Sequence, residues 1–410
     1  MLSAAAPSPD WRQAADRRVR ERWRIGPSGR ALVLVTAVLV AFGLAVLYSA
    51  SAVVAVEAGK GSALYLLRQL AGIVAGIACF AVAAKVDAER WYKWAWPVML
   101  VTLALMLLTI LPFTQSIAPR IHGSRRFLLG RSMQPSELGK LAVVIWTSML
   151  VVHKGAAIRG LTKGVLPFVA VIGALDVLAA LEPDLSTAMM YTLLTATILF
   201  AGGVRIGHFI ALGALAIPVF WHAAEHLQYV VLRMASFLDP GRAPAQVGYQ
   251  LKQSLIAVGS GGFLGVGFGR GWQQYGFLPF PFNDFIASNI GEEWGFVGLA
   301  LLILAFALYG FLGFRIAKSA RSPFQRLVAV GITTATLINA YLHIGVVIGL
   351  LPTTGLTLPF ISYGRSNLML SLVMTGILVN IGSRRERVLA AGATDPLAHA
   401  ALPATGLAPG

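Results

Sequence analysis

The stretch GSGGFLGVGFGRGWQQYGFLPFPFNDFIASNIGEEWGFVG, which runs from Gly259 to Gly298, leads from a glycine-dense loop into an apolar helix. The helix is predicted to begin at Asp284, and it carries two adjacent carboxylates, Glu292 and Glu293. Acidic side chains in or beside a membrane segment are costly and require a partner or a function. We therefore expect the rest of the chain to hold this loop and helix at one face of a bilayer.

The composition places the chain among polytopic membrane proteins. Its 410 residues are 57% hydrophobic and 12% charged, whereas soluble domains carry roughly 25% charged residues. The net charge of +16 is attributed to side chains that orient helices in the membrane, and no nucleic acid is expected as a partner. The single cysteine, Cys79, excludes an intrachain disulfide framework.

Ten apolar segments approach the roughly 20 residues that a helix needs to cross a bilayer. Backbone groups find no water in lipid, so each segment is predicted to be α-helical. The predicted fold class is an all-α polytopic membrane protein, with ten transmembrane helices and a large external loop, residues 223–283, between helices 7 and 8. The predicted spans are 31–56, 63–85, 94–113, 137–152, 165–181, 186–203, 206–222, 284–312, 326–350 and 367–382.

Basic residues indicate the orientation of these spans. Most of the 33 lysines and arginines fall in the N-terminal tail and in loops on the same side of the membrane. The positive-inside rule then places both termini in the cytoplasm. The remaining external lysines and arginines crowd into residues 114–136, 223–283 and 351–366, which indicates an anionic ligand outside the membrane.

The domain organisation is one membrane domain with two tails. Residues 1–30 are predicted to be a basic cytoplasmic tail, either solvated or lying as an interfacial helix on anionic lipid. Residues 31–385 form the transmembrane domain. Residues 386–410 are rich in alanine, proline and glycine and are predicted to be disordered.

The glycines between positions 259 and 271 do not form a nucleotide-binding motif. Neither the P-loop pattern nor the G-x-G-x-x-G spacing is present, and no strand precedes the loop. We expect these glycines to permit a tight re-entrant backbone or close helix contacts instead.

Asp284 admits two interpretations. It follows two prolines and Asn283 and precedes an apolar run, so it suits a helix N-cap. It equally suits a catalytic carboxylate at the membrane surface. The sequence leaves both open. Glu292, further along the same helix, is expected to face a cavity or a buried partner rather than lipid.

Other charged residues cluster at predicted helix ends. Glu137 and Lys140 are i,i+3 neighbours, and a structural ion pair is the favoured interpretation. Arg125, Arg126 and Arg131 suit phosphate binding, although helix-anchoring side chains would show the same pattern. Asp184, in the sequence EPDLST, suits a helix N-cap. The hydrophobic loop 351–367 is expected to dip against the bundle.

Several of these motifs together resemble the SEDS family (shape, elongation, division and sporulation) of bacterial cell-wall polymerases. They occur in family order over about residues 30 to 385, and the family's ten helices agree with the count above. Within the family the chain is more similar to the FtsW type than to the RodA type. The motifs are GSRRFLLG…MQPSELGK, EPDLSTA, the stretch from Gly259 to Gly298, and GLLPTTGLTLPFISYG.

The resemblance implies a peptidoglycan glycosyltransferase that uses lipid II and works with a class B penicillin-binding protein and other division or elongation proteins. The family's essential aspartate falls on Asp284, and the aspartate of its P-D-L motif falls on Asp184. The charged pair of its Q-P-S-E-x-x-K motif falls on Glu137 and Lys140, and the first Glu of its G-E-E-x-G motif on Glu292.

The chain departs from the family pattern at two places. The common P-E-x-H-T-D becomes Pro279 to Asp284 with phenylalanine in place of both Glu and His. The usual Y-G-G-S becomes Tyr363-Gly364-Arg365-Ser366. Arg365 places a large, charged side chain where the family has glycine.

The predicted chemistry is inverting transfer of a disaccharide-pentapeptide from lipid II to an acceptor 4-hydroxyl. Asp284 is the predicted base, and its pKa must be raised by desolvation for that task. Alternatively, Asp284 holds a divalent cation, Mg²⁺ or Mn²⁺. The candidate substrate-binding residues are Arg125, Arg126, Arg131, Lys252, Arg270, Asp184, Glu292 and Ser362. The alternative functions are a lipid II flippase, a RodA-type elongation polymerase and a non-catalytic scaffold.

Overall fold

Helices make up most of the described part of the computed structural model. The described residues are 19–111, 114, 118–119, 125–128, 133–214, 217, 228–239 and 245–389. Seven of the described helices are long and apolar enough to cross a membrane, and two shorter ones are also apolar. The long helices are α2 (Pro27–Glu57), α3 (Leu64–Lys85), α4 (Arg90–Ile110), α5 (Pro135–Lys154), α6 (Leu166–Leu181), α11 (Ile286–Lys318) and α12 (Pro323–Val347); the shorter ones are α7 (Leu185–Ala201) and α13 (Arg365–Ile381).

These nine helices coincide closely with nine of the ten predicted spans, and the chain is therefore a helical multi-pass membrane protein. The remaining predicted span, 206–222, is helical over residues 206–214, and most of its C-terminal part lies outside the described residues. Two short helical turns, η2 (Gly155–Arg159) and η3 (Leu161–Val165), connect α5 to α6.

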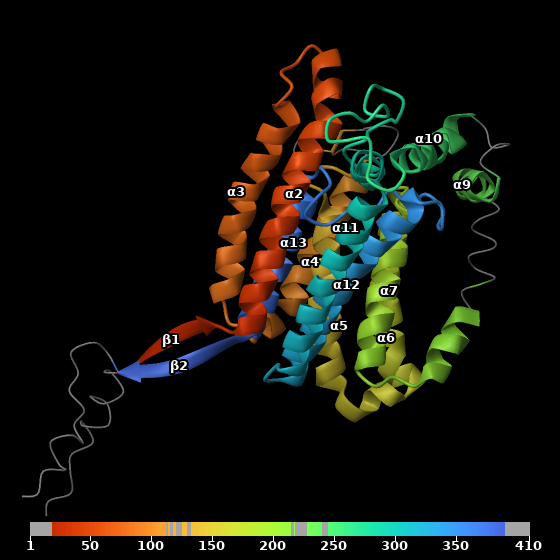
Figure 1. The fold of residues 1–410 in the computed structure, drawn as a ribbon. Coiled ribbons are helices and arrows are strands. Elements are labelled where there is room, and N and C mark those ends of the chain that lie inside the picture. The colour runs from red at the N-terminus through yellow and green to blue at the C-terminus, as the bar shows by residue number, and fades with distance from the viewer. Residues whose placement is uncertain are drawn as a thin grey trace, which may run out of the picture. The chain divides into compact units, whose positions relative to one another are not determined.

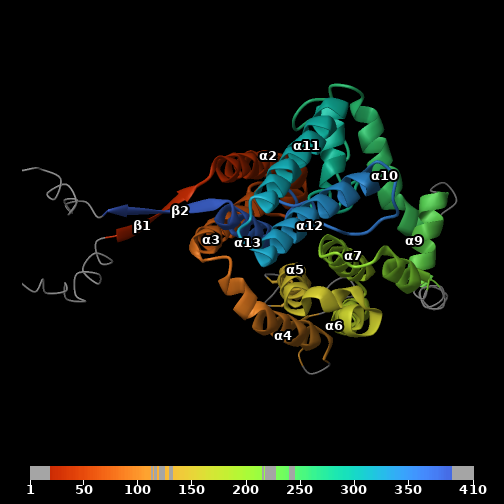
Figure 2. The same ribbon diagram turned by 90° about the horizontal axis from the view of Figure 1, so that it is seen from below.

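The helices form two groups that meet along α12 (Figures 1 and 2). Helices α4, α5, α6 and α7 lie on one side, and α2, α3, α11 and α13 on the other. Small residues permit the close contacts expected of membrane helices. A Cβ atom at Gly331 of α12 would lie 2.7 Å from Val144 of α5 and 2.9 Å from Ile198 of α7.

The predicted external loop 223–283 contains two helices that the sequence analysis did not identify. They are α9 (Gln228–Leu238) and α10 (Ala245–Gly261). The hydroxyl of Ser254 in α10 bonds both to Ser288 of α11 and to the Val347 carbonyl at the end of α12. This segment is therefore packed structure over α11 and α12 rather than an extended loop.

Helix α11 is broken at Gly295, and the glycine-rich loop is hydrogen-bonded around the break. Gly295 has φ 64° and ψ −158°, a conformation that favours glycine. The N–H groups of Val266 and Phe296 donate to the carbonyls of Glu292 and Gly262, at 3.0 and 2.9 Å. Backbone groups that the break frees in the membrane are thus satisfied within the protein. The glycines make the close helix contacts that the sequence predicted, and the alternative of a re-entrant backbone stays a prediction.

The two tails contribute a separate unit, a two-stranded antiparallel sheet of β1 (Val19–Ile25) and β2 (Ser383–Leu389). Trp23 donates a hydrogen bond to Ser383 within it, at 2.7 Å. Residues 386–389, assigned to a disordered tail in the sequence analysis, form the end of β2. Residues 1–18 and 390–410 of the predicted tails lie outside the described residues.

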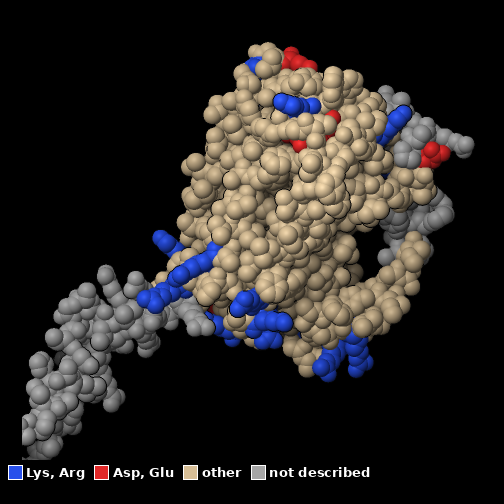
Figure 3. All heavy atoms as spheres, viewed as in Figure 1, with Lys and Arg blue, Asp and Glu red and all other residues tan. Residues whose placement is uncertain are grey.

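The two ends of the bundle differ in charge (Figure 3). Lysine and arginine side chains gather at the lower end in this view, and fewer are visible at the upper end. Helices α3, α4, α12 and α13 are tied together at one end of the bundle: Asn380 bonds to Ala84 and Ala88, and Ser322 bonds to Glu89. Asp284 and the residues around it lie at the opposite end.

Candidate active site

Asp284 lies in a turn directly before α11 and does not cap that helix. The N-cap residue is Phe285, and no side-chain hydrogen bond caps the helix. The Asp284 side chain is half-buried, and no hydrogen bond to its carboxylate is found among the described residues. The cap interpretation of Asp284 is therefore wrong, and its carboxylate is available for chemistry.

Asp284 has two arginines and a second carboxylate as its electrostatic neighbours. Burial raises the pKa of Asp284 to about 6 from its ordinary value of 3.8; the Arg126 guanidinium lowers this pKa, Asp184 raises it and Arg233 lowers it. Desolvation thus outweighs the nearby positive charge. The result is a carboxylate that is mostly ionised at neutral pH but more basic than a free aspartate, as a general base requires.

Asp184 caps α7 and also pairs with Arg126. Its carboxylate accepts a hydrogen bond from the Thr187 N–H at 3.2 Å, as the sequence predicted. The same side chain lies 3.5 Å from the Arg126 guanidinium. Beside it, burial raises the pKa of Glu182 to about 8, so this acid is mostly neutral at pH 7. The side chains that shift the pKa of Asp284 by their charge are therefore Arg126, Asp184 and Arg233.

A strap, residues 351–364, covers this site and is fastened by three helices. Arg233 of α9 donates to the Thr353 carbonyl at 3.0 Å, and Ser186 of α7 donates to the Thr354 carbonyl. His343 of α12 bonds through Nδ1 to the Leu356 carbonyl at 2.8 Å. The strap dips against the bundle, as its hydrophobicity predicted.

Glycine in the strap leaves space at the carboxylate. A Cβ atom at Gly355 would lie 3.7 Å from Oδ2 of Asp284, and Gly355 has φ +74°. Two phenylalanines near the site also have positive φ, Phe280 at 51° and Phe360 at 67°. Bulky residues rarely adopt this conformation, and such strain concentrates at functional sites.

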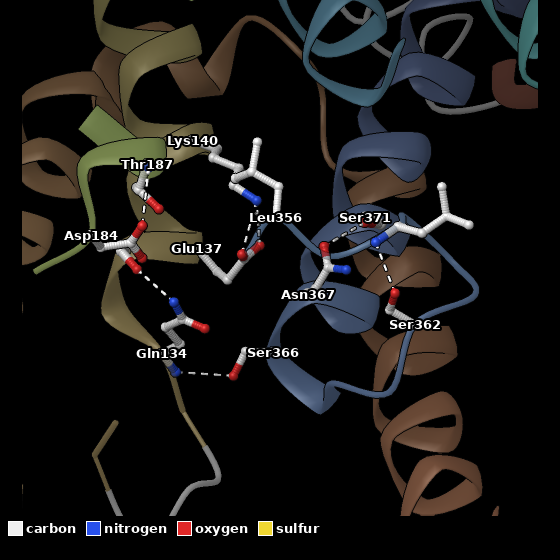
Figure 4. A network of polar contacts seen from close by, with 12 residues as sticks. Gln134, Glu137, Lys140, Asp184, Thr187, Leu356, Ser362, Ser366, Asn367 and Ser371 are labelled. Atoms are coloured by element: carbon white, nitrogen blue, oxygen red, sulfur yellow. Dashed lines mark hydrogen bonds and ion pairs between the residues drawn. The ribbon is translucent and has the colours of Figure 1, made fainter. Parts of the chain in front are cut away.

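The predicted ion pair is present at the start of α5 (Figure 4). The Lys140 ammonium donates to both carboxylate oxygens of Glu137, at 2.8 and 2.9 Å, and both side chains are buried. Gln134, just before the helix, bonds through its N–H to Ser366 at the start of α13, at 3.1 Å. The pair therefore lies where α5 meets α13, close to Asp184 in the same view.

Glu292 and its neighbour Glu293 fasten the glycine-rich loop. Glu292 accepts the Trp272 N–H at 2.7 Å and the Gln273 N–H at 3.3 Å. Glu293 accepts a hydrogen bond from Ser49 of α2. Buried carboxylates need such donors. These contacts are the buried partners predicted for Glu292. Glu292 is not among the charged neighbours of Asp284. Both observations favour a structural role for Glu292 over substrate binding.

The other predicted substrate-binding residues divide into four groups. Arg125 donates to the Leu111 carbonyl at 3.3 Å, which fastens its loop to the end of α4. Lys252 and Arg270 are exposed and are not among the charged neighbours of Asp284. Ser362 is buried in the strap and bonds to the Asn283 carbonyl at 2.8 Å. Arg131 lies outside the described residues.

Three residues of the site were missed in the sequence analysis. Arg233 was counted only as an external charge, although a lone arginine in the apolar helix α9 is a signal of a buried partner. Gly355 could not be distinguished from other loop glycines. Gln69 of α3 is 2% exposed and donates a hydrogen bond to the Ser362 carbonyl of the strap at 3.2 Å, and it was overlooked.

No preformed metal centre is found in the described part of the chain, where no three His, Cys, Asp or Glu side chains are placed to hold an ion. Asp184 and Asp284 remain as two neighbouring carboxylates. Mg²⁺ is commonly held by one or two carboxylates together with substrate phosphates. The donor set therefore fits a cation that arrives with a phosphorylated ligand.

Comparisons with known proteins agree with the motifs. A family model described as cell cycle protein, for FtsW, RodA and SpoVE, matches residues 30–387. The chain is 36% identical over 367 residues to a Trichlorobacter lovleyi protein named probable peptidoglycan glycosyltransferase FtsW, covering 89% of this chain and 96% of that protein.

Two solved structures share the fold. One belongs to a study of the structural coordination of polymerization and crosslinking by a peptidoglycan synthase complex; it has TM-score 0.70 and 26% identity, covering 86% of this chain and 96% of that chain. The other, the rod shape determining protein RodA of Thermus thermophilus, has TM-score 0.61 and 24% identity, covering 86% and 95%.

Proposed function

The chain belongs to the FtsW, RodA and SpoVE family of cell cycle proteins, and on this premise we infer that it is a peptidoglycan glycosyltransferase of the FtsW type. Its substrate is lipid II, which serves as both donor and acceptor of the growing glycan strand. The pathway is septal wall synthesis in cell division rather than elongation.

The observation that carries the mechanism is the setting of Asp284. Its carboxylate caps no helix, its pKa is raised to about 6, and Arg126 and Arg233 are its positively charged neighbours. A base beside positive charge suits a reaction in which a hydroxyl loses a proton while a pyrophosphate departs.

In the proposed reaction, the acceptor 4-hydroxyl oxygen attacks C1 of the donor sugar. Its proton passes to the Asp284 carboxylate, the C1–O bond to the lipid pyrophosphate breaks, and the configuration at C1 inverts. Arg126 and Arg233 stabilise the negative charge that develops on the departing pyrophosphate. Asp184 holds Arg126 in place through their ion pair.

A divalent cation, Mg²⁺ or Mn²⁺, fits the same site. Asp284 and Asp184 would hold it together with the substrate pyrophosphate. The cation would neutralise charge on the leaving group. Loss of glycan synthesis on addition of a chelator, restored by either cation, would support this role. Full activity of chelated protein would contradict it.

The membrane arrangement proposed for this function has ten spans with both termini in the cytoplasm. It is supported by the nine apolar helices and the helical residues 206–214. The site then faces the outer side of the bacterial cytoplasmic membrane. A class B penicillin-binding protein is the proposed partner, together with other division proteins. Likeness to a subunit of a peptidoglycan synthase complex supports this partner.

The decisive experiment is lipid II polymerisation by the purified protein, alone and with its cognate transpeptidase. Asp284→Asn should remain folded and bind its partner, because no hydrogen bond in the described structure depends on the charge. Its polymerisation should fall at least about a hundredfold, as expected for loss of a general base.

Near-normal glycan synthesis by purified Asp284→Asn would overturn the catalytic role. The assay in detergent also excludes a flippase function as the source of the signal, because transport requires two compartments whereas polymerisation does not. A protein that serves only as a scaffold would give no glycan in any variant.

A further inference from the structure

The two residues before Asp284 are hydrogen-bonded to the strap. The Ser362 hydroxyl donates to the Asn283 carbonyl at 2.8 Å, and the Tyr363 N–H donates to the Phe282 carbonyl at 2.9 Å. The same hydroxyl accepts the Leu358 N–H at 2.8 Å. The strap therefore holds the peptide that leads into Asp284 at two adjacent points.

The strap is in turn held by Gln69 of α3. Its amide nitrogen donates to the Ser362 carbonyl at 3.2 Å, and its amide oxygen accepts the Gly364 N–H at 3.3 Å. A buried amide is costly unless its donor and acceptor are both used. Gln69 uses both on the strap. Gln69 thus links α3 to Ser362, whose hydroxyl bonds to the Asn283 carbonyl.

An aromatic cluster packs around these bonds. The Tyr65 ring of α3 lies 4.6 Å from the Phe282 ring and 5.3 Å from the Tyr363 ring, between centroids. The Phe282 and Tyr363 rings lie 5.7 Å apart. Phe282 stands where the family motif has histidine, so in this chain an apolar contact with α3 occupies that position.

We propose that Gln69 and Ser362 form a clamp that positions the Asp284 carboxylate for proton transfer. The proposal rests on the function proposed above, because the clamp affects the reaction only if Asp284 is the general base. Neither residue touches the substrate in this proposal. Both act through Asn283, the neighbour of Asp284 in the chain.

The physical reason is that, in the described structure, the backbone of the turn positions Asp284. No hydrogen bond to its carboxylate is found among the described residues, so the side chain is aimed by the turn that carries it. A displacement of about 1 Å between reacting groups can cost roughly a hundredfold in rate. Loosening the clamp should therefore slow chemistry more than it weakens lipid II binding.

The test compares Ser362→Ala and Gln69→Met with wild type in steady-state lipid II polymerisation, normalised to folded protein. Gln69→Met removes the hydrogen bonds between α3 and the strap. Ser362→Ala removes the hydrogen bond from the strap to the Asn283 carbonyl, and neither change adds a charge. We expect kcat to fall about ten- to a hundredfold, with KM for lipid II changed less than twofold. Ser362→Thr, which keeps the hydroxyl, should recover part of the loss.

The double variant gives a second readout. It should lose less than the product of the single effects, because both residues serve one contact chain. The charged neighbours of Asp284 are Arg126, Asp184 and Arg233, and neither variant changes them.

Ser51→Ala is the matched control, since Ser51 is a fully buried serine whose hydroxyl has no partner in the described structure. It should keep the wild-type kcat and the wild-type KM for lipid II. If Gln69→Met fails to fold, Ser362→Ala carries the test, because it removes a single oxygen.

Two outcomes would overturn the clamp while leaving the proposed function intact, provided that Asp284→Asn is inactive. One is wild-type kcat in both clamp variants. The other is a lower melting temperature with unchanged kcat per folded molecule, which would make the contacts purely structural. If Asp284→Asn is itself active, the proposed function fails as well.

Discussion

At the scale of single residues, Asp284 determines how the enzyme should respond to pH. A general base must be ionised, and burial raises the pKa of this carboxyl to about 6. The active form is therefore present above pH 6 and is lost as the pH falls through that value. We predict that kcat/KM for lipid II polymerisation decreases about tenfold for each unit below pH 6.

This acid limb should disappear in the residual activity of Asp284→Asn, which has no titrating group at that position. Measurements from about pH 4.5 to 8 in detergent are suitable. A wild-type rate that stays constant down to about pH 4.5 would show that the base titrates like an ordinary aspartate. That result would contradict a pKa raised by burial.

Arg233 is the basic residue of the predicted external loop 223–283 whose charge acts on Asp284. It approaches the site from α9, holding the Thr353 carbonyl and adding positive charge near Asp284. We predict that Arg233→Gln lowers kcat/KM about ten- to a hundredfold, comparable to losing one preorganised charge at a reacting centre.

Lys252→Gln and Arg270→Gln are the matched controls, because each removes one exposed external charge. Both should stay within about twofold of wild type in the same polymerisation assay. Equal losses in all three variants would indicate a diffuse electrostatic effect and contradict the specific role of Arg233.

At the scale of elements, the buried pair Glu137–Lys140 fixes the start of α5 where it meets α7 and α13. The neighbouring Ser136 carbonyl accepts the Tyr191 hydroxyl of α7 at 2.6 Å, and Gly139 leaves room for that ring. We predict that Glu137→Ala lowers the free energy of unfolding by about 3–5 kcal/mol, because it leaves a buried ammonium unpaired.

Replacing both partners with leucine should restore most of that stability, since no buried charge then remains. Thermal unfolding in detergent, followed by tryptophan fluorescence, measures both effects. Wild-type stability of Glu137→Ala with loss of glycan synthesis would instead assign the pair to substrate binding or catalysis.

Helix α11 shows why the glycine-rich loop and the two glutamates belong to one element. A Cβ at Gly295 would lie 2.4 Å from the Gly265 nitrogen, and one at Gly265 would lie 2.2 Å from the Glu293 carbonyl oxygen. The break in the helix and the loop can approach so closely only because both positions are glycine. Glu292 then closes the loop by accepting its N–H groups.

At the scale of the whole molecule, charge asymmetry predicts the orientation. Lysine and arginine gather at the end of the bundle remote from the site (Figure 3), which the positive-inside rule assigns to the cytoplasm. In a Cys79→Ala background, Lys252→Cys should react with a membrane-impermeant thiol reagent in cells with a permeabilised outer barrier, and Arg159→Cys should not. Labelling of position 159 with protection of position 252 would reverse the orientation.

The structure explains how the chain accommodates two residues that differ from the family motifs, Phe282 and Arg365. Arg365 stands where the family has glycine, and its side chain lies against Gly72 of α3, 3.0 Å from the position of a Cβ there. Phe282 replaces a histidine and packs with Tyr65 and Tyr363. Both substitutions are therefore absorbed by the face of α3 that meets the strap.

The sequence by itself determined the membrane helices and the ion pair, and it indicated Asp284 as the candidate catalytic residue. Spans can be recognised locally, because lipid requires about 20 apolar residues in each helix. Glu137 and Lys140 are three residues apart on one helix, so their contact also follows from local geometry. Asp284 was identified by its motif, although the sequence alone could not choose between a cap and a base.

Only the tertiary structure decided which charges meet and what the remaining polar residues do. Arg126, Arg233, Asp184 and Asp284 come from four segments far apart in the chain, and the folded bundle alone brings them together. The same holds for the contacts between Gln69 and the strap. Electrostatic and hydrogen-bonding partners depend on distance in space, and no spacing in the sequence encodes that distance across different helices.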